Sequence, residues 1–315
     1  MFVEAAARLH FGVLDLRGSL GRWFGGLGAA ASAPTLLLSA VPADTVDVEG
    51  ADADRAAEFA RRFQAHWGLR RGARIRVHRA LPAHAGLGSG TQLALAVARA
   101  MAAVYDLDGD AAALARAVGR ARRSAIGTWT FAGGGLIVEG GRRQGSDEVG
   151  PLVARLPFPP SWRCVLAVPR GVPGISGAVE DAAFAALPPP PEHEVARVAH
   201  LVLMGVLPAV ASGDLRAFGA AITEIQQING RWFAPVQGGP FAPGPGEALV
   251  RRMQEWGASG VGQSSWGPAV YGIVEGAEQA AELAARVGQL LDGHGEVFEG
   301  PFRAEGARVW RVGVT

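Results

Sequence analysis

Lysine is absent from this chain of 315 residues, so all thirty of its lysine-or-arginine cations are arginine. That absence excludes enzymes that react through a lysine Schiff base, enzymes that hold pyridoxal phosphate on lysine, and nucleotide-binding proteins with a Walker A lysine. An anion bound by this protein must therefore be held by arginine, histidine, backbone N–H groups or a metal ion.

Cysteine is almost absent as well, because Cys164 is the only one and no disulfide can form within the chain. It begins the apolar run 164–168, which favours a buried strand residue over a nucleophile. No uninterrupted apolar run reaches the roughly 18 residues of a membrane span, and the first residues lack a signal-peptide pattern. We therefore expect a reduced, cytoplasmic enzyme that does not associate with a membrane.

Charge of either sign is sparse: charged residues make up 19% of the chain, and the net charge is +1. This balance argues against a nucleic-acid-binding protein, which would need a concentrated positive field. Hydrophobic residues make up 49%, enough for a full core. The length suits two modest domains, which we place at 1–160 and 161–315.

Hydrophobic periodicity predicts an α+β fold, because helices and strands interleave without a strict βαβ rhythm. Strands are expected at 3–16, 26–48, 73–80, 135–139, 162–169, near 260, and at 268–274, 295–302 and 306–314. Helices are expected at 52–67, 91–105, 110–123, 193–211, 214–229, 247–257 and 276–291.

The segment Gly86-Leu-Gly-Ser-Gly-Thr91 lies between a predicted strand and a predicted helix. Glycines allow a ligand to approach the backbone, and the first N–H groups of a helix attract anions, so a phosphate site is one interpretation. The other is a tight turn in which Ser89 or Thr91 caps the helix. Neither the Walker A motif nor the dinucleotide fingerprint fits this spacing.

Arg8 and His10 are two residues apart and therefore share one face of a predicted strand. Such a pair could bind a phosphate or a carboxylate. The alternative is that both side chains lie on a solvent-exposed face of the strand. Asp15 could orient Arg8, bind a metal ion or form a turn.

Two further segments combine glycines with hydrogen-bond donors. In residues 122–135 the donors are Arg123, Ser124 and Thr128, and the alternative is a glycine-rich loop that leads into a strand. In residues 260–269 they are Gln263, Ser264 and Ser265, followed by Trp266. This tryptophan could stack on an aromatic ligand or belong to the core. Glycine-rich loops this far apart suggest a ligand held between two domains.

These segments together resemble a known family. Pro82-x-x-x-Gly86-Leu-Gly-Ser-Gly90 resembles the central motif of the GHMP superfamily, named for galactokinase, homoserine kinase, mevalonate kinase and phosphomevalonate kinase. Arg8 to Asp15 resembles its first motif, and Gly260 to Gly267 its third. Within the superfamily the chain is most similar to the beta-ribofuranosylaminobenzene 5'-phosphate synthases. The strings that carry this likeness are Arg8-Leu-His-Phe-Gly12, Gly25-Gly-Leu-Gly28, Ala85 to Gln92, Ile126-Gly-Thr128, Gly238-Gly239 and Gly262-Gln-Ser-Ser-Trp-Gly-Pro268.

The resemblance implies a ribosomal-S5-like N-terminal half and a ferredoxin-like C-terminal half. It also implies a pentosyltransferase of methanopterin biosynthesis, in which phosphoribosyl pyrophosphate reacts with 4-aminobenzoate or 4-hydroxybenzoate. The products would be a C-riboside, carbon dioxide and pyrophosphate. Dependence on Mg²⁺ and a homodimer would be expected from the family.

The resemblance also suggests roles for particular residues. Positive charge for the departing pyrophosphate would come from Arg8, His10 and Arg123. A phosphate cradle would comprise Gly86, Gly88, Ser89, Gly90, Thr91 and Gln92. The aromatic acceptor would lie beside Ser264, Ser265 and Trp266. Asp15 and Glu180 are candidate Mg²⁺ ligands.

One departure separates the chain from kinases of this superfamily. They usually place an Asp base in the segment that matches Ser124 to Thr130, whereas no acid lies between Arg123 and Glu139 here. An ATP-dependent small-molecule kinase, the alternative function, would lack the group that deprotonates its alcohol. A non-catalytic sensor is a third hypothesis, which the retention of all three ligand loops argues against.

Overall fold

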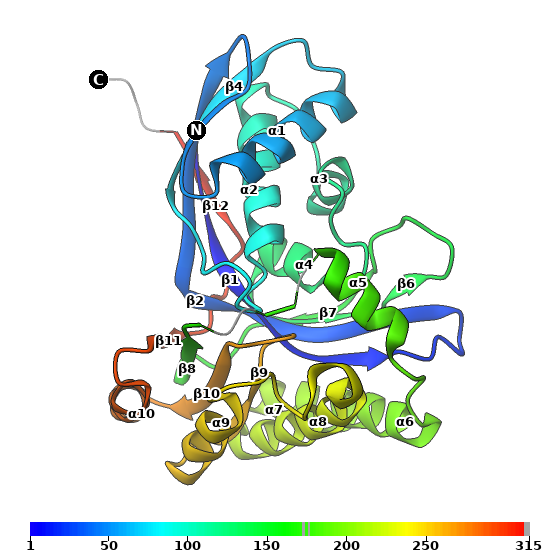
Figure 1. The fold of residues 1–315 in the computed structure, drawn as a ribbon, viewed down its shortest axis with the longest axis vertical. Helices are drawn as coiled ribbons and strands as arrows, with labels where there is room; N and C mark the ends of the chain where they lie inside the picture. Colours follow the sequence, from blue (N-terminus) through cyan, green and yellow to red (C-terminus); the bar gives the residue numbers. More distant parts are fainter. Residues whose placement is uncertain (172–173, 176, 312–315) are drawn as a thin grey trace.

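Two β-sheets organise the protein, and the computed structural model describes residues 1–171, 174–175 and 177–311 (Figure 1). Within these residues the first sheet contains β1 (Phe2–Asp15), β2 (Arg22–Ala43), β3 (Asp47–Gly50), β4 (Gly72–Arg79), β5 (Leu136–Glu139), β6 (Arg142–Arg143), β7 (Leu152–Leu156) and β12 (Arg308–Trp310). The second contains β8 (Trp162–Pro169), β9 (Gly260–Gln263), β10 (Val270–Glu275) and β11 (Gly295–Pro301). Helices interleave with these strands, which confirms the predicted α+β class.

The antiparallel pair β1–β2 is the centre of the first sheet, and its register shifts between Ala6 and Arg8 and again between His10 and Gly12. Such irregularities bend a strand and re-aim its side chains. The three residues from Arg8 to His10 keep one register, opposite 28–30. Arg8 and His10 therefore share a face, as predicted.

The first domain packs its helices against this sheet: α1 (Ala53–Trp67), α2 (Ser89–Val104), α3 (Ala111–Ala117) and α4 (Ile126–Gly133). Helix α2 is buried over most of its length, because its many alanines let sheet and neighbouring helices approach closely. The predicted helix over 110–123 ends too late, because α3 stops before Gly119, whose φ is +69°. Helix α4 was not predicted.

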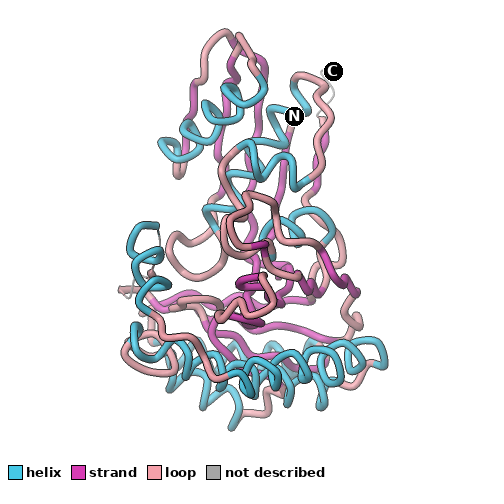
Figure 2. Tube along the Cα trace, turned by 90° about the vertical axis from the view of Figure 1, so that its right-hand side faces the viewer, coloured by secondary structure: helices cyan, strands magenta, loops and turns pink. Residues whose placement is uncertain are grey.

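The second domain contains α5 (Gly177–Ala186), α6 (Glu192–Leu201), the π-helical turn η1 (Val202–Val206), α7 (Leu207–Ser212), α8 (Leu215–Gln237), α9 (Gly246–Glu255) and α10 (Ala277–Leu291). Figure 2 shows helices forming a layer at one end of the molecule. Helices α9 and α10 cover one face of the second sheet with residues such as Leu249 and Leu283. On the other face, Ile222 and Ile225 of α8 belong to the same apolar cluster as Phe11 of β1, so the two domains share one core.

Helix α8 continues to Gln237, beyond the predicted end at residue 229. Pro235 lies inside its last turn, and the helix ends at Gly238, whose φ is +84°. The additional turns matter for function, because they carry aromatic and amide side chains toward the region between the domains.

The run Glu192–Ser212, formed by α6, η1 and α7, is the one helix of the described chain long and apolar enough to cross a membrane by length and composition. It packs against α8, and Val198, Val202 and Val206 are buried. About a third of its most apolar stretch is buried.

The chain changes sheet between β7 and β8, close to the boundary predicted at residue 160. It returns at its end, since β12 pairs antiparallel with β1. Only 308–310 of the strand predicted at 306–314 are a strand in the described residues, and 312–314 lie outside them. Cys164 is buried on β8, as predicted, and burial raises the pKa of its thiol to about 12.

Candidate active site

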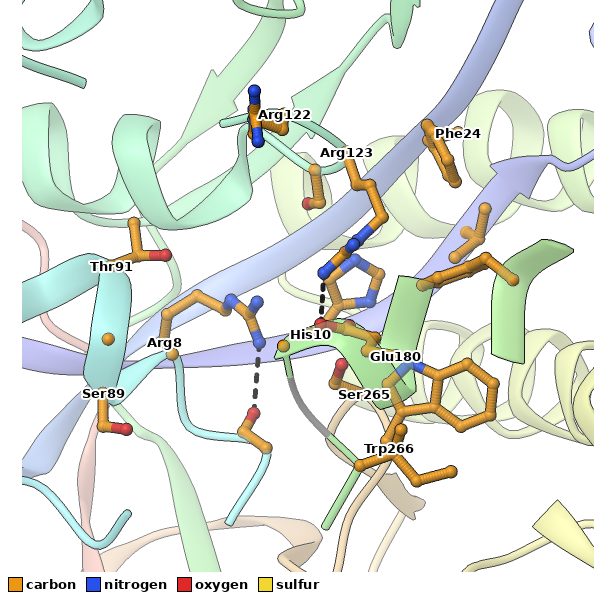
Figure 3. Close-up of a pocket in the computed structure, with 18 of the residues that line it drawn as sticks. Arg8, His10, Phe24, Ser89, Thr91, Arg122, Arg123, Glu180, Ser265 and Trp266 are labelled. Atoms are coloured by element: carbon orange, nitrogen blue, oxygen red, sulfur yellow. Dashed lines mark hydrogen bonds and ion pairs between the residues drawn. The ribbon is translucent and has the colours of Figure 1, made fainter. Parts of the chain in front are cut away.

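A cavity of about 540 Å³ lies where the two domains meet (Figure 3). The first domain contributes residues of β1, the loop before α2 and the connection between α3 and α4. The second contributes residues of α5, α8 and the loop after β9. Glycine-rich loops from distant parts of the sequence therefore meet at one ligand-sized space, as the sequence suggested.

The N-terminus of α2 opens onto this cavity. Its N-cap is Gly88, which has no side chain to cap the helix, so the prediction that Ser89 or Thr91 caps it was wrong. Among the described residues, the backbone N–H groups of Ser89 and Gly90 have no acceptor. N–H groups without an acceptor at the positive end of a helix can bind an anion.

Glycine is required at the start of this loop. Gly86 has φ +76°, and a Cβ there would lie 2.0 Å from the backbone oxygen of Ser264. The Ser264 hydroxyl donates a 2.7 Å hydrogen bond to the Gly86 carbonyl and accepts one of 3.0 Å from the His10 N–H. From a fully buried position, Ser264 thus joins its own glycine-rich loop to the loop before α2 and to β1.

Arginines surround the same helix end. Arg8 donates to the Gly86 carbonyl at 3.1 Å, and its buried Nε has no hydrogen-bond partner among the described residues. Arg55 and Arg120 lie over Gly90, since a Cβ there would be 2.7 Å and 2.3 Å from their Nη2 atoms. No described carboxylate pairs with Arg120. The cavity therefore has a cationic half, defined by Arg8, Arg55, Arg120 and the start of α2.

Burial lowers the pKa of Arg8 to about 10 and that of Arg120 to about 10, with Arg55 a further cause for Arg120. Both remain cations at neutral pH. Burial and neighbouring positive charge make a charged guanidinium group unfavourable. Such a group is therefore stabilised more by a bound anion than a solvated guanidinium group would be.

Arg123 is paired differently. It donates to the carboxylate of Glu180 (Figure 3) and to that of Asp181, both on α5. Its guanidinium also lies 5.4 Å from the ring centre of Phe184. Helix α5 thus places two carboxylates at the edge of the cationic half.

The opposite side of the cavity is aromatic. The Trp266 ring lies 4.6 Å from that of Phe233 and 5.3 Å from that of Phe184, both at steep angles. Phe184 also meets Phe24 at 5.4 Å. All four of these aromatic side chains line the cavity, and we call them the aromatic half.

His10 lies between the two halves and is 6% exposed. Burial, and then the charge of Arg8, lower the pKa of its imidazole to about 3, so the ring is neutral. The expectation that His10 supplies positive charge was therefore wrong. A neutral imidazole can instead exchange a proton or accept a hydrogen bond.

Most predicted site residues line the cavity, while some support it from outside. The lining includes Arg8, His10, Gly86, Gly88, Ser89, Gly90, Thr91, Arg123, Ser124, Gln263, Ser265 and Trp266. Asp15, Gln92, Thr128 and Ser264 are not among the described lining residues.

Each of these four has a local explanation, which for Ser264 is the pair of hydrogen bonds to Gly86 and His10 described above. Asp15 accepts hydrogen bonds from the N–H groups of Arg17 and Gly18, the turn that the sequence left open. Gln92 donates to the Gly127 carbonyl. Thr128 is fully buried on α4. Gln263, although it lines the cavity, uses its amide to hold the loop, accepting from Ala242 and donating to Ser265.

Strained backbone gathers at the cavity. Of the seven described non-glycine residues with positive φ, four line it: Phe24, His84, Ala121 and Ser265. Such conformations are unfavourable and persist where the surroundings enforce them, often at functional sites.

Comparison with known proteins supports both the architecture and the family. The family profiles described as GHMP kinases N terminal domain and GHMP kinases C terminal match residues 54–134 and 206–293. The beta-ribofuranosylphenol 5'-phosphate synthase of Methanothermobacter thermautotrophicus is 33% identical, over 98% of each chain. That of Archaeoglobus fulgidus is 35% identical, over 90% of this chain and 91% of its own. This chain belongs to the beta-ribofuranosylphenol 5'-phosphate synthase family.

Comparison with solved structures confirms that this chain has the expected GHMP fold. Homoserine kinase from Cytophaga hutchinsonii aligns with a TM-score of 0.71 at 17% identity, covering 98% of this chain and 96% of its own. Mevalonate pyrophosphate decarboxylase from Streptococcus pyogenes aligns with a TM-score of 0.70 at 11% identity, covering 96% of each chain. At these identities the likeness concerns the fold alone.

Several lining residues of this synthase-family chain were missed by sequence reasoning. Arg55 lies on an amphipathic helix, and Arg120 lies between α3 and the segment 122–135, outside the predicted donor segments. Phe24 and Phe184 lie outside the sequence motifs. The neighbours Trp232 and Phe233 differ: Phe233 lines the cavity, while Trp232 is buried and donates a hydrogen bond to Glu194.

The donor set bears on the expected Mg²⁺. No group of three or more His, Cys, Asp or Glu side chains in the described chain is placed to hold a metal. Three carboxylates line the cavity, from Glu58, Glu180 and Asp181. Mg²⁺ commonly binds through one or two carboxylates, with phosphate oxygens and water completing its shell. Glu180 and Asp181, beside free phosphate-binding groups, fit that arrangement.

Proposed function

We propose that this chain is a decarboxylating C-riboside synthase, a pentosyltransferase of methanopterin biosynthesis. It would condense phosphoribosyl pyrophosphate with 4-hydroxybenzoate or 4-aminobenzoate and release carbon dioxide and pyrophosphate. The observation that carries the proposal is the division of one cavity into a cationic half and an aromatic half. The names of its relatives, which refer to a ribofuranosylphenol phosphate, agree with it.

The cationic half suits a departing pyrophosphate. Arg8, Arg55 and Arg120 face the free N–H groups of Ser89 and Gly90. In the transition state the bond from the anomeric carbon to pyrophosphate breaks, and its electron pair leaves on oxygen. Fixed donors placed where this charge develops lower the barrier, because they need no rearrangement.

The aromatic half suits the acceptor. The ring carbon that bears the carboxylate attacks the anomeric carbon and becomes tetrahedral. Its bond to the carboxylate then breaks, carbon dioxide leaves, and the electron pair restores the aromatic ring. Phe233 and Trp266 would hold the ring in a fixed orientation, which is the main requirement of a reaction between two bound substrates.

Mg²⁺ belongs to the proposal. Glu180 and Asp181 would hold it together with pyrophosphate oxygens, and the ion would supply charge neutralisation for the leaving group. Arg123, which these carboxylates now engage, would become available to the substrate.

The kinase alternative lacks a base. Glu139, the first acid after Arg123, is fully buried and accepts hydrogen bonds from Ala125 and Gly141. It is not among the described lining residues. The lining carboxylates Glu58, Glu180 and Asp181 are all paired with arginine. An alcohol in this cavity would have no unpaired carboxylate among the described lining residues to deprotonate it.

The test uses the purified chain with phosphoribosyl pyrophosphate, Mg²⁺ and carboxyl-labelled 4-hydroxybenzoate or 4-aminobenzoate. We expect labelled carbon dioxide, pyrophosphate and a phosphorylated C-riboside of matching mass, all lost on chelation of Mg²⁺. The proposal fails if neither acid releases label while ATP and an alcohol yield ADP.

A homodimer stays a prediction from the family resemblance, and a cytoplasmic location stays a prediction from the cysteine content and the apolar pattern of the sequence. Sedimentation equilibrium of the purified chain tests the first, and cell fractionation the second.

A further inference from the structure

The imidazole of His10 has hydrogen-bonding capacity that the fold does not use. The backbone N–H of His10 bonds to Ser264, but its ring makes no hydrogen bond with any described residue. A Cβ on Gly26 would lie 3.4 Å from Nε2 and 3.5 Å from Cε1, so that edge of the ring faces β2, and His10 is itself one of the residues that line the cavity. Figure 3 shows His10 between Arg8 and Trp266.

The amides around this position are engaged elsewhere. Asn229 accepts from the Val13 N–H at 2.6 Å and donates to its carbonyl at 3.2 Å. Gln226 donates to the Phe11 carbonyl and accepts from the Gln263 N–H. The Ser265 hydroxyl and the side-chain oxygen of Gln237 make no hydrogen bond with any described residue, but neither group is a base. Among these uncharged side chains, His10 is thus the one that can take a proton.

Resting on the function proposed above, we propose that His10 is the general base for the para substituent of the aromatic acid, and that it acts on a hydroxyl and not on an amine. As the ring attacks, the hydroxyl oxygen lends an electron pair and becomes the oxygen of a protonated dienone. His10 takes that proton. When carbon dioxide leaves, the electron pair returns to the ring, the oxygen recovers its own pair, and His10 gives the proton back.

The neutral state of the ring fits this role. A base kept neutral by burial and by Arg8 does not remove the proton of a resting phenol, whose pKa is about 10 in tyrosine. The protonated dienone is a far stronger acid, so a weak base suffices. The charged groups around the ring are Arg8 of β1, Arg123 before α4, and Glu180 and Asp181 of α5.

An amine substituent does not need this base. Its nitrogen lends a pair to give an iminium ion that keeps both protons until carbon dioxide leaves. The structure therefore predicts that loss of the imidazole discriminates between the two acids.

The experiment compares His10→Asn with wild type and with His200→Asn, which changes an exposed histidine. We expect kcat with 4-hydroxybenzoate to fall by about 10²- to 10⁴-fold, the usual contribution of a general base. Turnover of 4-aminobenzoate should fall less than about tenfold, with KM for phosphoribosyl pyrophosphate unchanged. Circular dichroism of each variant checks the fold.

A second readout does not need the amine substrate. Near pH 10 the phenol is ionised before it reacts, so the defect of His10→Asn with 4-hydroxybenzoate should shrink as pH rises from 7 to 10. An equal loss with both acids, or a defect that pH leaves unchanged, would overturn the role of His10 while the synthase function stands. Wild-type protein that releases no carbon dioxide from either acid would instead refute the function.

Discussion

The Ser264 hydroxyl lies 2.7 Å from the Gly86 carbonyl oxygen, and this hydrogen bond fastens the loop after β9 to the loop before α2. The Ser264 hydroxyl oxygen also accepts a hydrogen bond from the His10 N–H. Three segments that are far apart in the sequence thus converge on one buried hydroxyl.

Ser264→Ala should remove both hydrogen bonds, which leaves the His10 N–H without its acceptor and the Gly86 carbonyl with the hydrogen bond from Arg8 alone. Buried groups left unsatisfied cost about 1–3 kcal/mol each, so we expect the free energy of unfolding to fall by about 2 kcal/mol. Urea denaturation measures it. Ser265→Ala is the matched control and should leave stability unchanged, because its hydroxyl makes no hydrogen bond with the described residues. Equal effects would contradict the role given to Ser264.

Arg120→Gln should weaken phosphoribosyl pyrophosphate binding without unfolding the protein. Arg120 lies over the start of α2 and forms no ion pair with a described residue, and a charge-assisted hydrogen bond to an anion contributes about 1.5–3 kcal/mol. We expect KM for this substrate to rise about tenfold or more, measured by steady-state kinetics. Arg116→Gln, an exposed arginine on α3, is the control. A KM that is the same in both variants would remove Arg120 from the site.

Gly90→Ala and Gly86→Ala should fail in different ways. A Cβ on Gly90 would meet the flexible ends of Arg55 and Arg120, so the fold should persist while the guanidinium groups are displaced and substrate affinity falls. A Cβ on Gly86 would meet backbone at 2.0 Å, in a positive-φ conformation, so folding itself should suffer. Thermal unfolding and KM, measured on both variants, separate the outcomes; a stable, fully active Gly86→Ala would be the contrary result.

Glu139 should make stability depend on pH. Burial raises the pKa of its carboxyl to about 7, against hydrogen bonds from Gly141 and Ala125 that favour the charged form. The folded protein binds the carboxyl proton of Glu139 more tightly than the unfolded chain does. Protonation of Glu139 therefore stabilises the fold fully below about pH 4.5, and this stabilisation is lost as pH rises through 7.

The measurement is the free energy of unfolding of wild type and Glu139→Gln at pH 5 and pH 8. Wild type should lose about 2 kcal/mol more than the variant over this interval. Identical pH slopes in the two proteins would show that Glu139 stays ionised throughout.

Sequence patterns predicted the strands and helices that have clear periodicity, and the loops whose glycines have a steric reason. Gly86 belongs to that second group. Helix α4 was missed because Ile126 to Gly133 contains glycines and β-branched residues, which have low helix propensity. Glu139 accepts from the N-cap Ala125, and packing of this segment against β1 and β2 supplies the rest.

The composition of the cavity was harder to predict than its position. Arg8, His10 and Trp266 stand in motifs, so sequence reasoning found them. Arg55 and Arg120 reach the site only because α1 and the end of α3 pack beside α2. The charge state of His10 could not be predicted either, since it depends on burial and on the neighbouring Arg8.

The pairing of β12 with β1, at Phe2 opposite Trp310 and Glu4 opposite Arg308, has a topological consequence. The second domain is an insertion into the first, entered after β7 and left before β12. One cut near residue 160 would therefore give an N-terminal fragment without its edge strand. Conversely, the first and last strands are neighbours, so a circular permutant that links them and opens an exposed loop elsewhere keeps both sheets whole.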